Sequence, residues 1–432
     1  MAFISTSPSA ARTVLTAVRR AMGPRIKEKQ RSEFASGLET MTLSDIRQQF
    51  TISVPEKSAN SEENARLHRA AHALVRQDNW ETLGQLIREH DQERRTTTSG
   101  KATADVLSAG ARQDLSDTIA MGLLPTNENG LASATDGVEM LDQVLIDNSD
   151  DYGVALVVAQ AHMDLGSVWR GQGWADEVPA SDWKKFARHF RRATSILEQF
   201  DPIANDSPAL AAARCRSLAG QPDAAQRIIA DYENLIDLAP HYADSYRQFG
   251  QALLPRWYGS YELLEERARK LAKETYDHWG SAAYALTFMD AARDDKEALG
   301  LVDVAMMLQG LGDYMRTQKD QAIVNQVISY LVVSLAPTGP LVSGSKRALQ
   351  NRSTLMAAAP ELARTYLREI HPDVWAEAAD SHDPSAPPAK AWQQKQMGLE
   401  EAFGTLSKAY EREILRGRHI FFDHDEVEIL TR

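Results

Sequence analysis

Residues 208–254 read PALAAARCRSLAGQPDAAQRIIADYENLIDLAPHYADSYRQFGQALL, and this stretch decides the fold. Ala211, Cys215 and Leu218 recur at the spacing of one helix face, which predicts a helix over 208–219. Gly220-Gln221-Pro222 ends this helix and starts the next, because proline is favoured in the first helical turn. The second helix is expected to bury Ala225, Ile228, Ile229, Tyr232 and Ile236. A third helix follows Pro240 at once, so the stretch predicts stacked helical hairpins.

This stretch resembles the tetratricopeptide repeat. Gly220 and Ala225 keep the family's Gly-to-Ala spacing across the turn, and Pro240 ends the unit about three residues later than the family period places it. The family's first-helix pattern is matched by Tyr246, Phe249, Gly250 and Leu253. The resemblance implies an all-α, tetratricopeptide-like superhelix of stacked hairpins, whose concave groove binds a peptide or a partner protein.

A second resemblance covers roughly residues 134–310. The segment LLPRWYGSYE (253–262) looks like the PRWGGS signature of an uncharacterised bacterial family with a domain of unknown function, with Tyr258 where that family usually has Gly. The family also tends to show an Arg-Gly pair after a long helix and a downstream Trp. The corresponding residues here are Arg170, Gly171, Trp174 and Trp183. This resemblance implies a fold and no chemistry.

The rest of the chain repeats amphipathic helix patterns, and strand patterns are nearly absent before the last dozen residues. After a helical hairpin that starts at Glu62, further helices are expected over 102–121, 134–147, 151–169, 180–200, 261–275, 279–293, 296–315, 319–335 and 389–416. We therefore predict a basic N-terminal extension (1–60), a degenerate helical-repeat array (61–380), and a linker, terminal helix and acidic, aromatic tail (381–432).

Composition excludes several classes of protein. The 432 residues are 43% hydrophobic with a net charge of −12, which argues against disorder and against a generally nucleic-acid-binding surface. A single cysteine excludes an internal disulfide and a cysteine-based zinc cluster. The longest apolar stretches are far shorter than the ~20 residues that a bilayer requires. We expect a cytoplasmic protein.

The first 31 residues are basic and contain apolar residues at helical spacing. Three interpretations stay open: a surface helix or frayed terminus, a helix that binds a membrane surface or an acidic partner, and an organelle transit peptide. There is no apolar core of a secretory signal.

Motifs that suggest nucleotide or metal chemistry fail on inspection. In GPLVSGSK (339–346), Ser345 stands between the second Gly and the Lys, so we expect an interhelical loop in which Ser343 or Ser345 caps the next helix. His68 and His72 lie one helical turn apart without a matching third ligand. The acidic run 147–151 reads as a helix cap, because Tyr152 replaces the glycine that a calcium loop needs. We predict no metal and no cofactor.

Two further positions have competing interpretations. Cys215 lies on an apolar stripe between arginines, which favours a buried inert thiol over a reactive one. The tail around Ile420-Phe421-Phe422 is expected to be a plain terminus, poorly ordered beyond Phe422. The alternatives are a hard-ligand metal site, or an extended segment that docks on the chain's own helices or on a partner's strand.

The most unusual clusters combine Arg, Trp and Gly where a helix meets a loop. We predict partner-binding residues in both clusters, namely Arg170, Trp174, Arg256, Trp257 and Tyr258, because Arg and Trp dominate binding hot spots. The competing interpretation is packing, in which Trp fills the space between helix layers while Arg stacks on it or bonds helix carbonyls.

The leading function hypothesis is a non-enzymatic scaffold or adaptor that binds a protein or peptide, without nucleic acid. No nucleophile–base pair or metal-ligand set is apparent. The alternative is an enzyme or small-ligand sensor, which would require a pocket where several of Arg170, Arg256, His162, Asp164 and Glu262 converge. A third hypothesis gives the basic N-terminus a nucleic-acid or lipid ligand.

Overall fold

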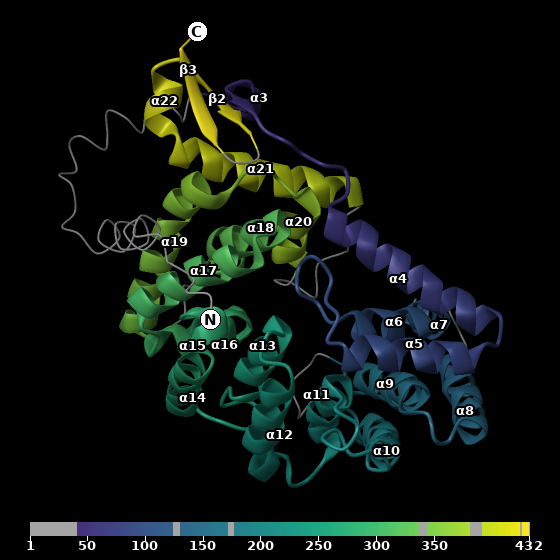
Figure 1. Ribbon diagram of the computed structural model, residues 1–432. Helices are drawn as coiled ribbons and strands as arrows, with labels where there is room; N and C mark the ends of the chain where they lie inside the picture. Colours follow the sequence, from purple (N-terminus) through teal and green to yellow (C-terminus); the bar gives the residue numbers. More distant parts are fainter. Residues whose placement is uncertain are drawn as a thin grey trace. The chain divides into compact units, whose positions relative to one another are not determined.

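The computed structural model describes residues 41–123, 130–171, 177–336, 344–380, 391–423 and 426–431 (Figure 1). Twenty α-helices and three short strands fall within these residues, which confirms the predicted all-α class. None of the helices in these ranges is long and apolar enough to cross a membrane. The tetratricopeptide-like superhelix stays a prediction.

The chain forms two compact units. The central unit comprises Ala59–Ser245, and the terminal unit combines Met1–Ser58 with Tyr246–Arg432. The predicted array of 61–380 is thus shared between both units, and the predicted tail of 381–432 falls within the terminal unit.

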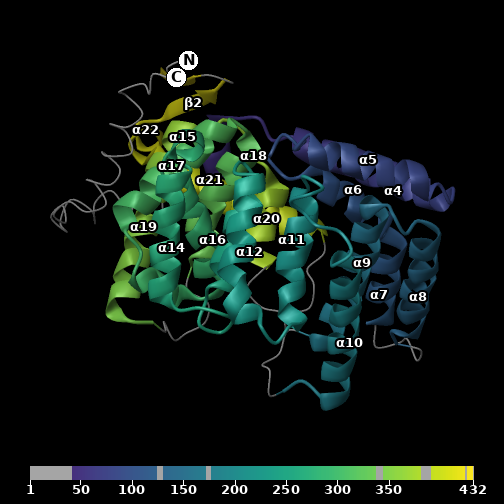
Figure 2. The ribbon, with the colours of Figure 1, turned by 60° about the horizontal axis from the view of Figure 1, so that its bottom comes forward.

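The central unit is built from consecutive helices. They are α4 (Ala59–Arg76), α5 (Trp80–Gln92), α6 (Thr103–Ala111), α7 (Gln113–Gly122), α8 (Ala132–Asp147), α9 (Tyr152–Arg170), α10 (Ala180–Leu197), α11 (Pro208–Ser217), α12 (Ala224–Leu238) and the start of α13 (Ala243–Ala252). Helices α7 to α10 lie side by side (Figure 2).

Helix α9 is the core of this unit. It packs against α5, α8, α10 and α11, and every residue from Tyr152 to Ala159 is buried. A helix that is apolar on all sides must be surrounded by others, which explains this position. The carboxylate of Asp151 caps it, accepting hydrogen bonds from the backbone N–H groups of Gly153 (2.8 Å) and Val154 (3.3 Å). The acidic run is therefore a helix cap, as predicted.

The stretch 208–254 forms α11, α12 and α13, with one error in the predicted register. Ala211, Cys215 and Leu218 are buried, which confirms this part of the prediction, and burial raises the pKa of the Cys215 thiol. In α12, however, Ala224 is buried and Ala225 is exposed. The buried stripe of α12 begins one residue earlier because it continues through Ile228 to Leu235.

Several predicted helices are interrupted, including those expected over 296–315 and 389–416, and two others show the physical reason. The helix expected over 102–121 breaks at Arg112, whose buried guanidinium donates to Asp164 (2.8 Å) and Gln160 (2.5 Å) of α9. The helix expected over 279–293 begins only at Ala282, because Gly280 has a φ of 59°. The first interruption depends on tertiary contacts and the second on a backbone conformation. Apolar periodicity encodes neither of them.

The terminal unit contains the remaining elements. They are α3 (Leu43–Arg47), β1 (Phe50–Thr51), most of α13, α14 (Tyr261–Glu274), α15 (Tyr276–Trp279), α16 (Ala282–Asp294), α17 (Val304–Gln318), α18 (Gln321–Ser329), α19 (Lys346–Tyr366), α20 (Pro372–Asp380), α21 (Ala391–Ala409), α22 (Glu411–Leu415), β2 (Arg418–Phe422) and β3 (Val427–Thr431). Ser345 caps α19 by accepting from the Ala348 N–H at 3.3 Å, which confirms one of the two predicted caps. Ser343 lies outside the described residues.

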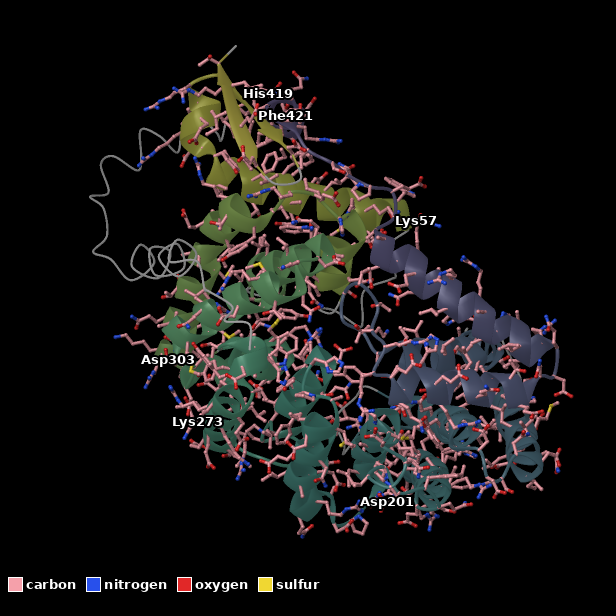
Figure 3. All side chains as sticks on the ribbon, viewed as in Figure 1. Lys57, Asp201, Lys273, Asp303, His419 and Phe421 are labelled. Atoms are coloured by element: carbon pink, nitrogen blue, oxygen red, sulfur yellow. The ribbon has the colours of Figure 1, made fainter. Side chains whose placement is uncertain are left out.

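The C-terminal tail is a hairpin, so the expectation of a plain terminus is wrong. Strand β2 pairs in parallel with β1 and antiparallel with β3, beside α21 and α22 (Figure 1). Ile420 and Phe422 face inward, and Phe50, Phe403 and Tyr410 form an aromatic cluster with Phe422. His419 and Phe421, labelled in Figure 3, lie on the other face of the sheet, where His419 Nε2 is 2.8 Å from Thr51 Oγ1.

Helix α16 is buried along most of its length, and α13 approaches it closely. A Cβ added at Gly250 would lie 1.7 Å from the carbonyl oxygen of Thr287. Only glycine permits such a contact between helix backbones, so Gly250 fixes where α13 crosses α16.

We expect Gly250→Ala to lower the free energy of unfolding by about 3 kcal/mol, because the methyl group would push the two backbones apart. Gly404→Ala in α21 is the matched control, since a Cβ there meets nothing within 4 Å and alanine favours the helix by up to ~1 kcal/mol. Urea unfolding measures both variants. Equal stability of Gly250→Ala and the wild type would contradict the close crossing.

Candidate partner-binding surface

The strongest candidate surface is the turn Pro255–Ser260 of the terminal unit, called here the PRWYGS turn. Its backbone is hydrogen-bonded to the end of α13: the N–H of Trp257 donates to Leu254 O (2.9 Å) and that of Tyr258 to Ala252 O (3.2 Å). Ser260 then caps α14 by accepting from the Leu263 N–H at 3.2 Å. The turn is therefore fixed at both ends.

The turn presents an indole to solvent. Trp257 is 44% exposed, whereas Tyr258 is half-buried and its burial raises the pKa of its hydroxyl. The guanidinium of Arg256 lies 5.7 Å from the Trp257 ring centroid and 3.7 Å from Asp294. Arg256 thus links the exposed ring to the end of α16 through a cation–π contact and an ion pair.

Behind the turn, α13 and α16 are joined by ionic and polar contacts. Arg247 donates two hydrogen bonds to Asp290, at 3.1 and 2.8 Å, and both side chains are largely buried. Gln251 donates to Asp294 at 2.7 Å, so Asp294 serves both Gln251 and Arg256. We call this set of contacts the α13–α16 seam.

The seam continues into the segment after α16. Tyr261 donates to Asp295 at 2.7 Å, and burial together with this carboxylate raises the pKa of Tyr261 to about 12. Lys296 is sheltered beside it, where burial lowers its pKa to about 8, and it donates to the Arg293 carbonyl at 2.6 Å. These groups contact one another, and the exposed side chains of Arg256 and Trp257 form the accessible part of the surface.

The second predicted cluster belongs to the central unit. Arg170 donates to the carbonyl of Gly171 at 3.1 Å and lies 5.6 Å from the Trp183 ring centroid. Carbonyl bonding and stacking on Trp are the contacts that the packing interpretation expects for Arg170. Trp174 lies outside the described residues. The two clusters fall in different units.

The alternative of a ligand pocket loses support within the central unit. His162 and Asp164, two of its proposed residues, contact different neighbours. His162 lies between Asp142 (3.3 Å) and His189 (3.0 Å), whereas Asp164 forms ion pairs with Arg112 and Arg216. Charge from these two arginines keeps the pKa of Asp164 low despite its burial. In the terminal unit, Glu262 is exposed.

Metal chemistry also finds no support. His72 pairs with Asp114 at 2.9 Å, and burial lowers the pKa of His68. Within the described ranges, no group of three or more His, Cys, Asp or Glu side chains is placed to hold a metal ion.

One polar group that sequence reasoning missed is Asp91 of α5. It is 1% exposed and accepts hydrogen bonds from Ser207, Ala209 and Tyr152. The sequence does indicate that Asp91 is buried, because Asp91 continues the apolar stripe of Leu83 and Ile87 at helical spacing. A carboxylate on such a stripe must be buried with partners.

No family model, curated protein or solved structure matches the chain.

We expect the seam and the exposed ring to contribute very differently to stability. Asp290→Asn should lower the free energy of unfolding by about 2 kcal/mol, because it removes the charge of the carboxylate that pairs with the largely buried Arg247. Trp257→Ala should change it by less than about 0.5 kcal/mol, as for other exposed positions. Denaturant unfolding of both variants checks this contrast. Similar losses in the two variants would show that Trp257 is a packing residue.

We also expect acid sensitivity at the His162–His189 pair. Burial and the nearby charge of His162 lower the pKa of His189 to about 4, from an ordinary value of 6.5. The unfolded chain therefore takes up the proton first, and stability falls as pH drops from 6.5 towards 4, by about 2 kcal/mol. His189→Gln should remove this part of the pH dependence in unfolding curves between pH 7 and 4. An unchanged dependence in the variant would contradict the assignment.

Proposed function

We propose that the chain is a non-enzymatic helical scaffold that binds a partner protein or peptide. Arg256, Trp257 and Tyr258 form the contact surface in this proposal, and Arg170 and Trp174 contribute a second one. The observation that carries the proposal is the indole of Trp257, 44% exposed on a turn whose backbone is hydrogen-bonded. Tryptophan and arginine are the residues most enriched among binding hot spots.

Preorganisation supports the same conclusion. The ion pair with Asp294 and the contact with the Trp257 ring hold the Arg256 side chain. Ordering a long side chain on binding costs about 0.5–1.5 kcal/mol, so a side chain that is already held binds at a smaller entropic penalty. An exposed ring that contributes little to folding but is held in place is the arrangement expected of a binding anchor.

The proposal includes the predicted superhelix and the predicted location in the cell. A tetratricopeptide-like superhelix would supply a groove for the partner, and a cytoplasmic location in a bacterium fits the resemblance to the family with the PRWGGS signature. The basic N-terminus, whose predicted ligands stay untested, lies outside the described residues.

The test uses a photo-crosslinking amino acid, p-benzoyl-phenylalanine, placed at Trp257 in the full chain expressed in bacterial cells. We expect a discrete crosslinked partner from this position. The same amino acid at Trp392, which is 65% exposed in α21 of the same unit, is the matched control and should yield no such band.

The affinity of the crosslinked partner for variants of the chain then tests whether the Trp257 ring is the main contact. We expect Trp257→Ala to weaken binding of the crosslinked partner at least tenfold, about 1.4 kcal/mol, while the thermal melt stays unchanged. Trp392→Ala should bind as the wild type does. Wild-type affinity in Trp257→Ala, or an equal loss in both variants, would contradict the proposal.

A further inference from the structure

A second polar centre lies in the central unit, where three segments meet around Asp91. Both oxygens of its carboxylate accept hydrogen bonds: Oδ1 from the Ala209 N–H (2.9 Å), and Oδ2 from the hydroxyls of Ser207 and Tyr152. Asp91 is therefore buried with its bonding capacity largely filled.

A second carboxylate, that of Asp105 on α6, lies near enough to Asp91 for the negative charge of Asp91 to raise its pKa. The side chain is half-buried, and no hydrogen bond or ion pair joins it to any residue in the described part of the chain. Burial and the negative charges of Asp244 and Asp91 raise the pKa of Asp105 to about 6, and Lys101 and Arg112 offset this only in part. Asp105 is thus an unpaired carboxylate in a sheltered, acidic environment.

The hydroxyl of Tyr242 provides an independent observation. Tyr242 is only 7% exposed, and its hydroxyl has no hydrogen-bond partner within the described ranges. Burial and the charges of Asp91 and Asp105 raise its pKa. Hydrogen bonds place these residues near one another at the end of α5: Nε2 of the preceding His241 lies 3.4 Å from Arg94 O, and the Thr103 N–H at the start of α6 donates to Arg95 O at 3.0 Å. A buried hydroxyl without a partner is rare in proteins and needs an explanation.

Of the nearby cations, Lys101 is exposed, whereas Arg94 and Arg112 are engaged elsewhere. Arg94, which follows Asp91 on the chain, forms an ion pair with Asp206 and donates to Leu238 O at 3.2 Å. Arg112 is bound to Asp164 at 2.8 Å. The charge of Asp105 is therefore left without a counter-ion from these side chains.

We propose that Asp105 and Tyr242, backed by Asp91, form a binding site for an organic cation, an ammonium or a guanidinium group. An N–H donor would satisfy the Asp105 carboxylate and the Tyr242 oxygen together. The donor set suits a metal ion poorly, because the donors that already occupy Asp91 leave too few oxygens for the six to eight ligands of calcium or the octahedron of magnesium. This site is separate from the PRWYGS turn and does not depend on the function proposed for it.

The test is calorimetric titration of the full chain at pH 7.5 with Nα-acetyl-arginine methylamide and Nα-acetyl-lysine methylamide, and with agmatine and butylamine as free cations. We expect saturable binding of a cation, and none of the neutral citrulline analogue. Tighter binding of the peptide-like probes would identify a side chain of a partner as the natural ligand, and tighter binding of the free cations a small molecule.

Variants separate the site from general charge effects. Asp105→Asn should weaken binding at least tenfold and leave the melting temperature equal or higher, because it removes an unpaired, half-buried charge. Tyr242→Phe should weaken binding several-fold. Asp237→Asn, which removes one exposed carboxylate of α12, is the matched control and should bind as the wild type does. Undiminished binding in Asp105→Asn, equal binding of the citrulline analogue, or binding of Mg²⁺ with the same sensitivity to Asp105→Asn would overturn the proposal.

The affinity should also depend on pH. Because Asp105 must be ionised to bind a cation, affinity should rise about tenfold from pH 5 to pH 7 in the wild type. Asp105→Asn should abolish this rise. A flat profile in the wild type would overturn the assignment to Asp105.

Discussion

The position of the PRWYGS turn depends on one constraint, the contact between α13 and α16. Gly250 allows the two backbones to touch at Thr287. Three residues before it Arg247 binds Asp290, and directly after it Gln251 binds Asp294. The same Asp294 then receives Arg256 from the turn. The steric contact sets the distance between the two helices, and the polar contacts set their register. Together they determine where the PRWYGS turn, which follows α13 directly, is placed.

This arrangement links folding to the proposed function. Burying an ion pair such as Arg247–Asp290 adds little net stability compared with apolar residues, but it allows few alternative packings. The benefit is a defined orientation of the exposed Trp257 ring. In the central unit the polar groups around Asp91 are arranged differently, because the Tyr242 hydroxyl and the Asp105 carboxylate have no hydrogen-bond partner among the described residues. In the two proposals, the terminal unit presents an aromatic anchor and the central unit an acidic site.

Much of the helical architecture could be predicted from local sequence, because periodicity, proline and capping residues act within a few positions. The buried Cys215, the cap at Asp151 and the cap at Ser345 are examples. The sheet could not be predicted, since Thr51 and His419 meet from 368 positions apart. Likewise, the unusual composition of the turn indicated a candidate site, but its partner Asp294 and the exposure of Trp257 are tertiary facts. The unpaired Asp105 was missed because unsatisfied groups are defined only by what surrounds them.

The most direct test of the preorganised turn is amide hydrogen exchange of the free protein, measured at the backbone N–H groups of Trp257 and Tyr258. Both groups donate hydrogen bonds to the end of α13, at 2.9 and 3.2 Å. If the seam holds the turn, these amides exchange as slowly as those of α13, and Asp294→Asn accelerates them while α9 in the central unit is unaffected. Exchange at the rate of an unstructured loop in the wild-type protein would contradict the claim that the turn is held in place before any partner binds.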